Sequence, residues 1–266
     1  MRIDSLRLVC FSPTGRSRTV IQGIARGIDH GTMELIDITT PQARKKPLET
    51  SGNELLIVAV PVYMGRVPAL LTEWLRAIRA HGTPAVSVVV YGNRVYEDAL
   101  LELTDILTRR GCRPIAGGAF IGEHSFSSAE APTAGGRPDA ADLHRAEAFG
   151  RKIREKLEAI PSVDRIPNVT IPGCRPYRGD PTLWTVDFIA VGDACTRCGT
   201  CAEGCPTGAI DPDEGYSADP EKCITCCACI KHCPAHARTM RPGPVRDASV
   251  RLSTLYRERK EPEYFL

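Results

Sequence analysis

The sequence predicts an α/β protein in which a doubly wound, five-stranded parallel sheet is followed by a small α+β module rich in cysteine. Three observations support this prediction. Short apolar runs alternate with amphipathic stretches over the first 160 residues, prolines gather in residues 161–183, and nine of the twelve cysteines lie between residues 195 and 233. Strands that alternate with crossover helices form parallel sheets covered on both faces. The expected division is a sheet domain at 1–160, a linker at 161–183, a cysteine-rich module at 184–240 and a docking tail at 241–266.

Five apolar runs, several of them rich in β-branched residues, predict strands buried on both faces. These runs are residues 6–11, 33–38, 55–60, 85–90 and 114–121. Helical patterns lie between and after them, at residues 18–27, 69–80, 96–110 and 139–160. Residues 39–53 hold prolines, lysines and glycine, and we expect them to be mostly loop. Ala248, Leu252 and Leu255 follow a helical spacing, which predicts one more helix in the tail.

Composition and charge exclude several classes of protein. The net charge of +2 argues against a nucleic-acid binder built on a broad basic field. The longest apolar run, residues 55–64, is about half the length that a membrane span requires. The N-terminal residues contain no apolar signal segment. We therefore expect a cytoplasmic protein whose cysteines serve metal or redox chemistry rather than disulfides.

The cysteines of the module form two copies of one motif. The first reads Cys195-x2-Cys198-x2-Cys201-x3-Cys205-Pro206, and the second reads Cys223-x2-Cys226-x2-Cys229-x3-Cys233-Pro234. Three cysteines spaced by two residues suit a loop that wraps one cube of iron and sulfide. Structural zinc is the alternative, but zinc ribbons use paired C-x2-C units without the further cysteines and the proline.

The module resembles bacterial two-cluster ferredoxins over about 55 residues, because all eight ligand positions and both prolines match. The resemblance implies two [4Fe–4S] clusters in which the fourth cysteine of each motif binds the other cluster. Cluster I is then held by Cys195, Cys198, Cys201 and Cys233, and cluster II by Cys223, Cys226, Cys229 and Cys205. Cys227 has no place in this pattern. We expect a small buried side chain there, with an exchange of ligands as the alternative.

A hydroxyl-rich loop follows the first expected strand. Ser12, Thr14 and Ser17 surround Gly15 immediately before a helix, and such a helix N-terminus attracts anions. The chain contains neither G-x-x-x-x-G-K-[ST] nor G-x-G, so the motifs for nucleotide hydrolysis and dinucleotide binding are missing. The loop suits a small terminal phosphate such as that of FMN. Hydroxyls at such a turn can also serve simply as helix caps.

Ser12-x-Thr14-Gly15-x-Ser17 resembles the phosphate loop of flavodoxins, and residues 61–68 and 91–96 fall where flavodoxins place their flavin-ring loops. All three segments follow strands, where doubly wound sheets bind their ligands. The resemblance implies an FMN site, to which His124 would also belong unless it is a surface histidine. The implied residues are Ser12, Thr14, Gly15, Arg16, Ser17, Pro61, Val62, Tyr63, Met64, Gly65, Tyr91, Gly92, Asn93, Tyr96 and His124.

Nearly the whole chain resembles the flavodoxin–ferredoxin fusion proteins of anaerobes. The segments that carry this resemblance are PVYMGRVP (61–68), YGNRVYEDAL (91–100), GAFIGEHSFS (118–127) and EPEYFL (261–266). The chain departs from ordinary flavodoxins in charge, because residues 1–160 hold 21 basic and 18 acidic side chains. The resemblance implies that electrons pass between FMN and two [4Fe–4S] clusters and on to redox partner proteins. FMN exchanges one or two electrons, whereas each cluster moves one.

Two alternatives stay open from the sequence. In the first, the chain is a reductase that reduces a small molecule at the FMN with electrons from the clusters. In the second, the flavodoxin-like domain has lost FMN and serves only for docking. No triad, carboxylate pair or nicotinamide fingerprint is present, so we assign no catalytic residue and favour the carrier. We expect the clusters to face the flavin edge, either within one chain or across a homodimer.

Overall fold

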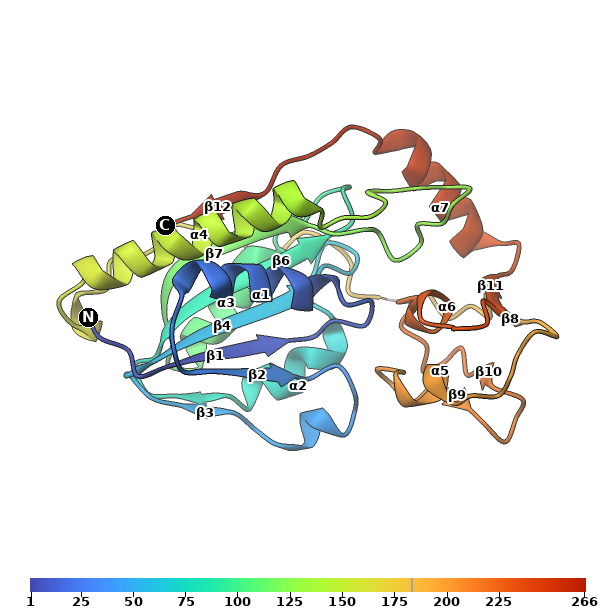
Figure 1. Cartoon of the computed structure of the whole chain (residues 1–266), viewed down its shortest axis with the longest axis horizontal. Helices are drawn as coiled ribbons and strands as arrows, with labels where there is room; N and C mark the ends of the chain where they lie inside the picture. The colour runs from blue at the N-terminus through green and yellow to red at the C-terminus, as the bar shows by residue number, and fades with distance from the viewer. Residues whose placement is uncertain (183) are drawn as a thin grey trace.

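The computed structural model describes residues 1–182 and 184–266, and it shows a sheet domain with a smaller cysteine-rich module beyond one end of the strands (Figure 1). Five strands of the main sheet are parallel, in the order β2-β1-β4-β6-β7. They are β1 (Ser5–Cys10), β2 (Met33–Asp37), β4 (Glu54–Pro61), β6 (Pro84–Tyr91) and β7 (Arg113–Ile121). Counted among themselves, these strands follow the order 2-1-3-4-5 of flavodoxin-like sheets. The predicted fold class is confirmed.

A sixth strand, β12 (Glu263–Phe265), extends the sheet beyond the five that the sequence predicts. It comes from the tail and runs antiparallel to β7, with Tyr264 opposite Gly118. Figure 1 shows the tail returning from the module along the sheet to reach this edge. Three residues are too few to show an alternating pattern, so the sequence predicts no strand here.

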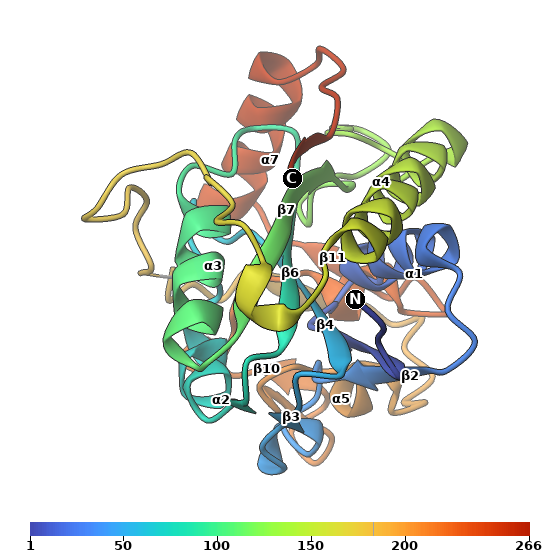
Figure 2. The same ribbon diagram turned by 90° about the vertical axis from the view of Figure 1, so that its left-hand side faces the viewer.

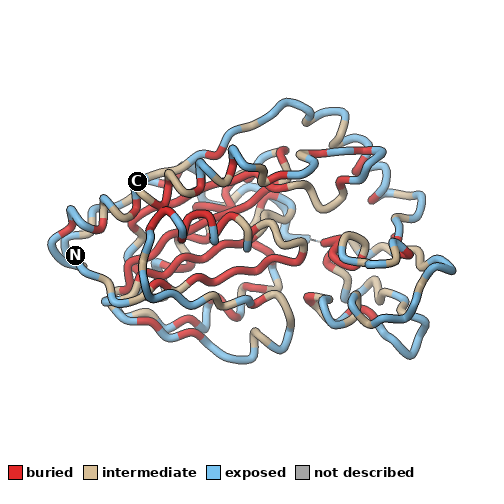
Figure 3. The backbone as a smooth tube through the Cα atoms, viewed as in Figure 1, coloured by how far each residue is buried: buried red, intermediate tan, exposed pale blue. Residues whose placement is uncertain are grey.

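Helices cover both faces of the sheet (Figure 2). The helices α1 (Arg16–Ile28) and α4 (Ala140–Ala159) lie on one face, and α2 (Thr72–Arg76) and α3 (Ala99–Arg109) lie on the other. The strands between them are almost entirely buried (Figure 3). The axes of α1 and α4 approach closely because Gly150 has no side chain; a Cβ there would lie 2.1 Å from the carbonyl oxygen of Ile24.

The helix expected at residues 69–80 is shorter in the structure. A 3-10 turn (Ala69–Leu71) leads into the five residues of α2, and then the chain extends as β5 (Arg79–Ala80). The strand β5 pairs with β3 (Glu49–Thr50), inside the segment expected to be loop. Backbone hydrogen bonds between these two segments, such as that from Arg79 N–H to the carbonyl oxygen of Leu48 just before β3 at 2.9 Å, favour the extended conformation over helix.

The residues expected to form the linker are attached to α3 over part of their length, and residue 183 lies outside the described residues. Ile171 is buried in the same core as the α3 side chains. Asp98, fully buried ahead of α3, accepts hydrogen bonds from Arg178 and from the backbone N–H of Cys174. A segment without regular periodicity is therefore fixed through side-chain contacts.

The module is small and has little core of its own. Its strands are β8 (Ile189–Val191), β9 (Ile210–Asp211), β10 (Ser217–Ala218) and β11 (Arg238–Met240), and its helices are α5 (Thr200–Glu203) and α6 (Ala228–Lys231). The strand pairs β8–β11 and β9–β10 are both antiparallel. The helix α7 (Pro244–Leu255) follows, at the place where the sequence predicts a helix. No helix within residues 1–182 and 184–266 has both the length and the apolar character needed to cross a membrane.

Candidate functional site

A pocket lies at the carboxyl ends of the parallel strands, where doubly wound sheets bind their ligands. The loops after β1, β4, β6 and β7 form most of its wall. Eleven of the residues predicted from the sequence line it: Ser12, Thr14, Arg16, Ser17, Pro61, Val62, Tyr63, Met64, Tyr91, Gly92 and His124. The structure therefore brings the three predicted loops and the His124 segment together around one cavity.

The N-terminus of α1 opens into this pocket. Gly15 precedes the helix with a φ of +82°, a conformation that glycine adopts without strain. The hydroxyl of Ser12 accepts a hydrogen bond from the backbone N–H of Arg18 at 3.0 Å. The first turn of the helix contains no acidic residue. Free N–H groups, hydroxyls and the positive end of the helix dipole together suit a phosphate group.

A network of partly buried charges joins the N-terminus of α1 to the cysteine-rich module. Glu123, in the loop after β7, accepts hydrogen bonds from Arg16 at 2.6 Å and from Lys231 of α6 at 2.5 Å. The pKa of Glu123 is lowered, because these cations outweigh a burial that by itself would raise it. The buried Nε of Arg16 has no partner among the described residues, as expected for a side chain beside a site that binds an anion.

His124 lies against the loop after β6, where only a glycine fits. A Cβ at Gly92 would come within 2.3 Å of the imidazole carbon Cδ2. The Nδ1 of His124 accepts a hydrogen bond from the backbone N–H of Phe126 at 3.0 Å, so the ring hydrogen sits on Nε2. Burial, with the charges of Lys231 and Arg94, lowers the pKa of His124 to about 4. The ring is therefore a neutral hydrogen-bond donor at neutral pH.

Four residues predicted from the sequence do not line the pocket, namely Gly15, Gly65, Asn93 and Tyr96. The two glycines shape the adjoining turns. The side-chain amide of Asn93 donates to the backbone carbonyl oxygens of Tyr256 and Glu258, at 2.8 Å each. The hydroxyl of Tyr96 donates to Glu263 in β12 at 3.1 Å. These two side chains bind the C-terminal tail where the resemblance implied the flavin.

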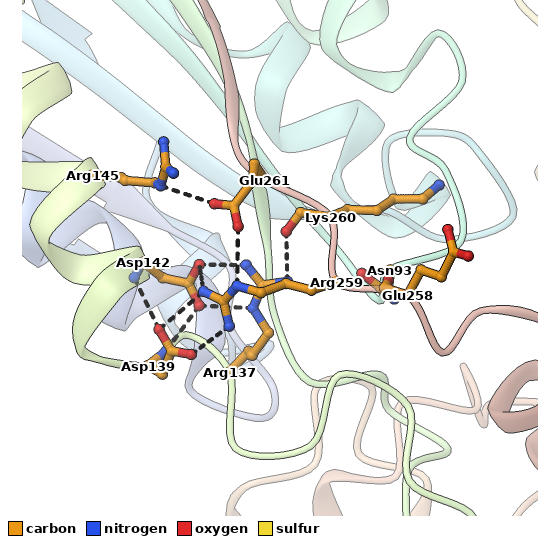
Figure 4. A network of polar contacts seen from close by, with 9 residues as sticks. All are labelled: Asn93, Arg137, Asp139, Asp142, Arg145, Glu258, Arg259, Lys260 and Glu261. Atoms are coloured by element: carbon orange, nitrogen blue, oxygen red, sulfur yellow. Dashed lines mark hydrogen bonds and ion pairs between the residues drawn. The ribbon is translucent and has the colours of Figure 1, made fainter.

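The end of the loop after β7 and the start of α4 also fix the tail, through a network of polar contacts (Figure 4). The buried guanidinium of Arg137 forms an ion pair with buried Asp142 and donates to the carbonyl oxygen of Lys260 at 2.8 Å. Arg259 contacts Asp142 and pairs with Asp139 at 2.7 Å. The tail is therefore attached beside the pocket as well as at the sheet edge.

The cysteines surround two further cavities in the module. One is lined by Cys195, Cys198, Cys201 and Cys233, and the other by Cys205, Cys223, Cys226 and Cys229, with Cys227 beside them. Each set contains three cysteines of one motif and the fourth cysteine of the other. The donor set fits two iron–sulfur clusters.

The two cysteine cavities have different surroundings. Cys226 and Cys229 of the second cavity are buried, whereas Cys198 of the first is exposed. Ile224 and Thr225, between two cysteines of the second motif, also line the strand-end pocket. Burial together with the neighbouring cysteines 223, 226 and 227 raises the pKa of the Tyr63 phenol. The second cavity therefore adjoins the strand-end pocket and the first adjoins solvent.

Side chains of both parts hold the module against the strand ends. The Nε2 of His232 lies 3.0 Å from the carbonyl oxygen of Pro13, and Arg44 donates to the carbonyl oxygen of Pro206 at 2.5 Å. The sequence gives no sign of these contacts, nor of Trp184 and Ile224 in the pocket wall. Phe126, which also lines the pocket, lies in the GAFIGEHSFS segment that carries the family resemblance.

Comparison with known proteins agrees with this arrangement for the module. A family described as the 4Fe-4S dicluster domain matches residues 188–246. The chain joins a flavodoxin-like domain to a 4Fe-4S dicluster domain. The strand order identifies the first part, and the family match identifies the second. The first assignment is one of fold, and the second is one of an iron–sulfur module.

Solved structures similar to the chain include several flavodoxins. A flavodoxin from the domain Archaea has a TM-score of 0.41 at 15% identity, covering 58% of this chain and 99% of its own. Oxidised flavodoxin 1 of Bacillus cereus has a TM-score of 0.41 at 17% identity, covering 57% of this chain and 98% of its own. The apo form of the NADH:FMN oxidoreductase EmoB has a TM-score of 0.42 at 16% identity, covering 61% of this chain and 94% of its own. A search of curated proteins finds no match.

Proposed function

We propose that this chain is an electron carrier that binds one FMN in the strand-end pocket and two [4Fe–4S] clusters in the cysteine cavities, and passes electrons to partner proteins. One observation carries the proposal. Ile224 lines both the strand-end pocket and the cavity of cluster II, so the two sites adjoin within one chain. This supports transfer within the chain and makes a dimer unnecessary for it.

The residues around the pocket divide into two groups with different tasks. Ser12, Thr14 and Ser17, with the N–H groups that begin α1, would hold the phosphate. Tyr63 and Tyr91 would contact the ring, and the neutral Nε2–H of His124 would donate a hydrogen bond to it. Bound FMN would supply the exchange of one or two electrons.

The cysteine motifs would set the properties of the clusters. Backbone N–H groups of Ala209 and Ala237 donate to Cys205 and Cys233, at 3.2 and 3.3 Å from the sulfur atoms. Such hydrogen bonds, with burial, tune cluster potentials. The domain boundaries proposed are those expected from the sequence, with the family match extending the module to residue 246.

The test is a protein prepared without oxygen and analysed for iron, sulfide and flavin. About eight iron atoms and one FMN per chain are expected from two four-iron clusters and one phosphate loop. The variant Ser17→Asp should lose FMN and keep its iron, because a carboxylate at the helix N-terminus repels the phosphate. Gln22→Glu, on the exposed side of the same helix, is the matched control and should keep both.

The outcomes also separate the alternatives. Wild-type protein that binds iron but no FMN would favour the docking domain. Rapid reduction of the flavin by NADH or NADPH, with turnover of a small acceptor, would favour the reductase. The carrier is supported if the reduced clusters and the flavin exchange electrons rapidly in a stopped-flow experiment that contains neither NADH nor NADPH.

A further inference from the structure

A buried arginine without a carboxylate partner lies beside the cavity of cluster I. Arg238 is 3% exposed, and no ion pair within residues 1–182 and 184–266 includes it. Its Nη1 donates to the carbonyl oxygen of Tyr216 at 2.8 Å and lies 3.7 Å from the sulfur of Cys201. Its buried Nε and Nη2 have no hydrogen-bond partner among the described residues. A buried cation of this kind requires an anion nearby.

The cavity beside Arg238 would contain that anion. Arg238 lines the cavity with the four cysteines of cluster I. A [4Fe–4S] cluster with four thiolate ligands carries a net negative charge and presents sulfur atoms as acceptors. The unpaired N–H groups of Arg238 therefore fit a cluster better than they fit the protein alone.

The internal repeat places a different side chain at the equivalent position of the first motif. The backbone N–H groups of Ala209 and Ala237 donate to the fourth cysteine of their motifs at nearly equal distances, so these positions correspond. The next residues are Ile210 and Arg238. Ile210 lines the cavity of cluster II and Arg238 that of cluster I. Equivalent positions thus carry an apolar side chain at one cluster and a cation at the other.

Arg238 lines the cavity of cluster I, and the described lining of the other cysteine cavity does not include it. Its Nη1 lies 3.7 Å from the sulfur of Cys201. We expect the electrostatic effect of this cation to be larger at cluster I.

We propose that Arg238 tunes the clusters by raising the reduction potential of cluster I above that of cluster II. The proposal rests on the proposed function, in that both clusters are bound. Reduction adds one electron to an anionic centre, and a fixed cation with N–H groups directed at its sulfur atoms stabilises the reduced form. One electron then leaves reduced cluster II and enters cluster I, without transfer of a proton.

The consequence is a direction for electron flow. Cluster II adjoins the flavin pocket through Ile224, and cluster I carries the exposed ligand Cys198. A higher potential at cluster I moves electrons from the interior to the surface, where a partner can accept them. Electrons arriving from a donor at cluster I would face the opposite gradient.

The test is a redox titration of the whole protein, followed by electron paramagnetic resonance, on Arg238→Ile, which copies the first motif. We expect the equilibrium between the clusters to shift at least tenfold towards reduced cluster II, equivalent to 59 mV for one electron. Cys198→Ser, which changes a ligand of cluster I alone, identifies which of the two potentials belongs to that cluster. Arg238→Lys keeps the charge and should retain most of the separation.

Two further variants keep the result decisive. Arg197→Asn removes an exposed cation from the same cysteine loop and tolerates its left-handed backbone, with a φ of +55°. It should shift the equilibrium less than threefold, because water screens this charge. If Arg238→Ile binds less iron, Arg238→Gln removes the charge with less change in polarity and carries the same expectation. An unchanged separation, or a larger fall at cluster II, overturns the proposal. Failure of the proposed function would appear instead as missing FMN or missing iron in the wild-type protein.

Discussion

The ion pair between Arg137 and Asp142 should be one of the most sensitive points of the sheet domain. The side chains are 6% and 1% exposed, and Arg137 Nε donates to Asp142 at 2.8 Å. Removing one member of a buried pair leaves an uncompensated charge and costs about 3–5 kcal/mol. In a protein of this size, each kcal/mol lowers the melting temperature by about 2–4 °C. Asp142→Asn should therefore lower it by about 6–20 °C.

Other contacts of the pair add to its effect. Asp142 also accepts the backbone N–H of Asp139 at 2.9 Å, at the start of α4, and lies 3.3 Å from Arg259 of the tail. Arg137 binds the carbonyl oxygen of Lys260 (Figure 4). The substitution should therefore loosen the tail and increase its susceptibility to proteases near Arg259.

The assay is denaturation by urea and by heat without oxygen, with Glu147→Gln as the matched control. Glu147 pairs with Arg26 at 2.8 Å, but these side chains are 31% and 53% exposed. Exposed pairs contribute about 0–1 kcal/mol. An equal, small loss of stability in both variants would refute the argument from burial. The double variant Arg137→Met with Asp142→Leu should recover much of the loss, because no unpaired charge stays behind.

Three further predictions concern the candidate sites. Cys233→Ser should lose cluster I and keep cluster II, so that iron falls from about eight to about four per chain; loss of cluster II alone would contradict the crossed ligation. Gly92→Ala should raise the Kd for FMN at least tenfold, about 1.4 kcal/mol, because the new Cβ would meet His124. Fluorescence titration measures this, with Gly31→Ala, which has open space around it, as the control. The pKa of His124 is lowered to about 4, so between that pH and about 6.5 the unfolded chain binds more protons than the folded one. The free energy of unfolding should therefore fall as the pH drops through this window, by up to about 1.4 kcal/mol per pH unit. Urea denaturation at several pH values measures this dependence, which should be weaker in His124→Gln.

The sequence predicts the five parallel strands and the cysteine sets because both produce strong local patterns. Buried strands such as 55–60 are continuous apolar runs, and the spacing of the cysteines follows from the size of the cluster that they wrap. The phosphate loop is predictable for a similar reason, since a strand, a turn and a helix follow one another directly.

Contacts between distant segments are not predictable in this way. Nothing in the sequence near Asn93 indicates that its amide binds the carbonyl oxygens of Tyr256 and Glu258. Ile224 has the appearance of a spacer between two ligands, and its place in the pocket wall depends on how the module packs on the sheet. The Arg44-Lys45-Lys46 segment has the composition of a solvated loop, yet Arg44 reaches Pro206.

The return of the chain to β7 after the module has a consequence for biosynthesis. The edge of β7 is covered by β12, whose residues are synthesised after both cysteine motifs. During translation that edge stays open, and open strand edges pair readily with other chains. Synthesis of the module therefore precedes closure of the sheet, and a chain that ended before residue 263 would leave the edge of β7 exposed.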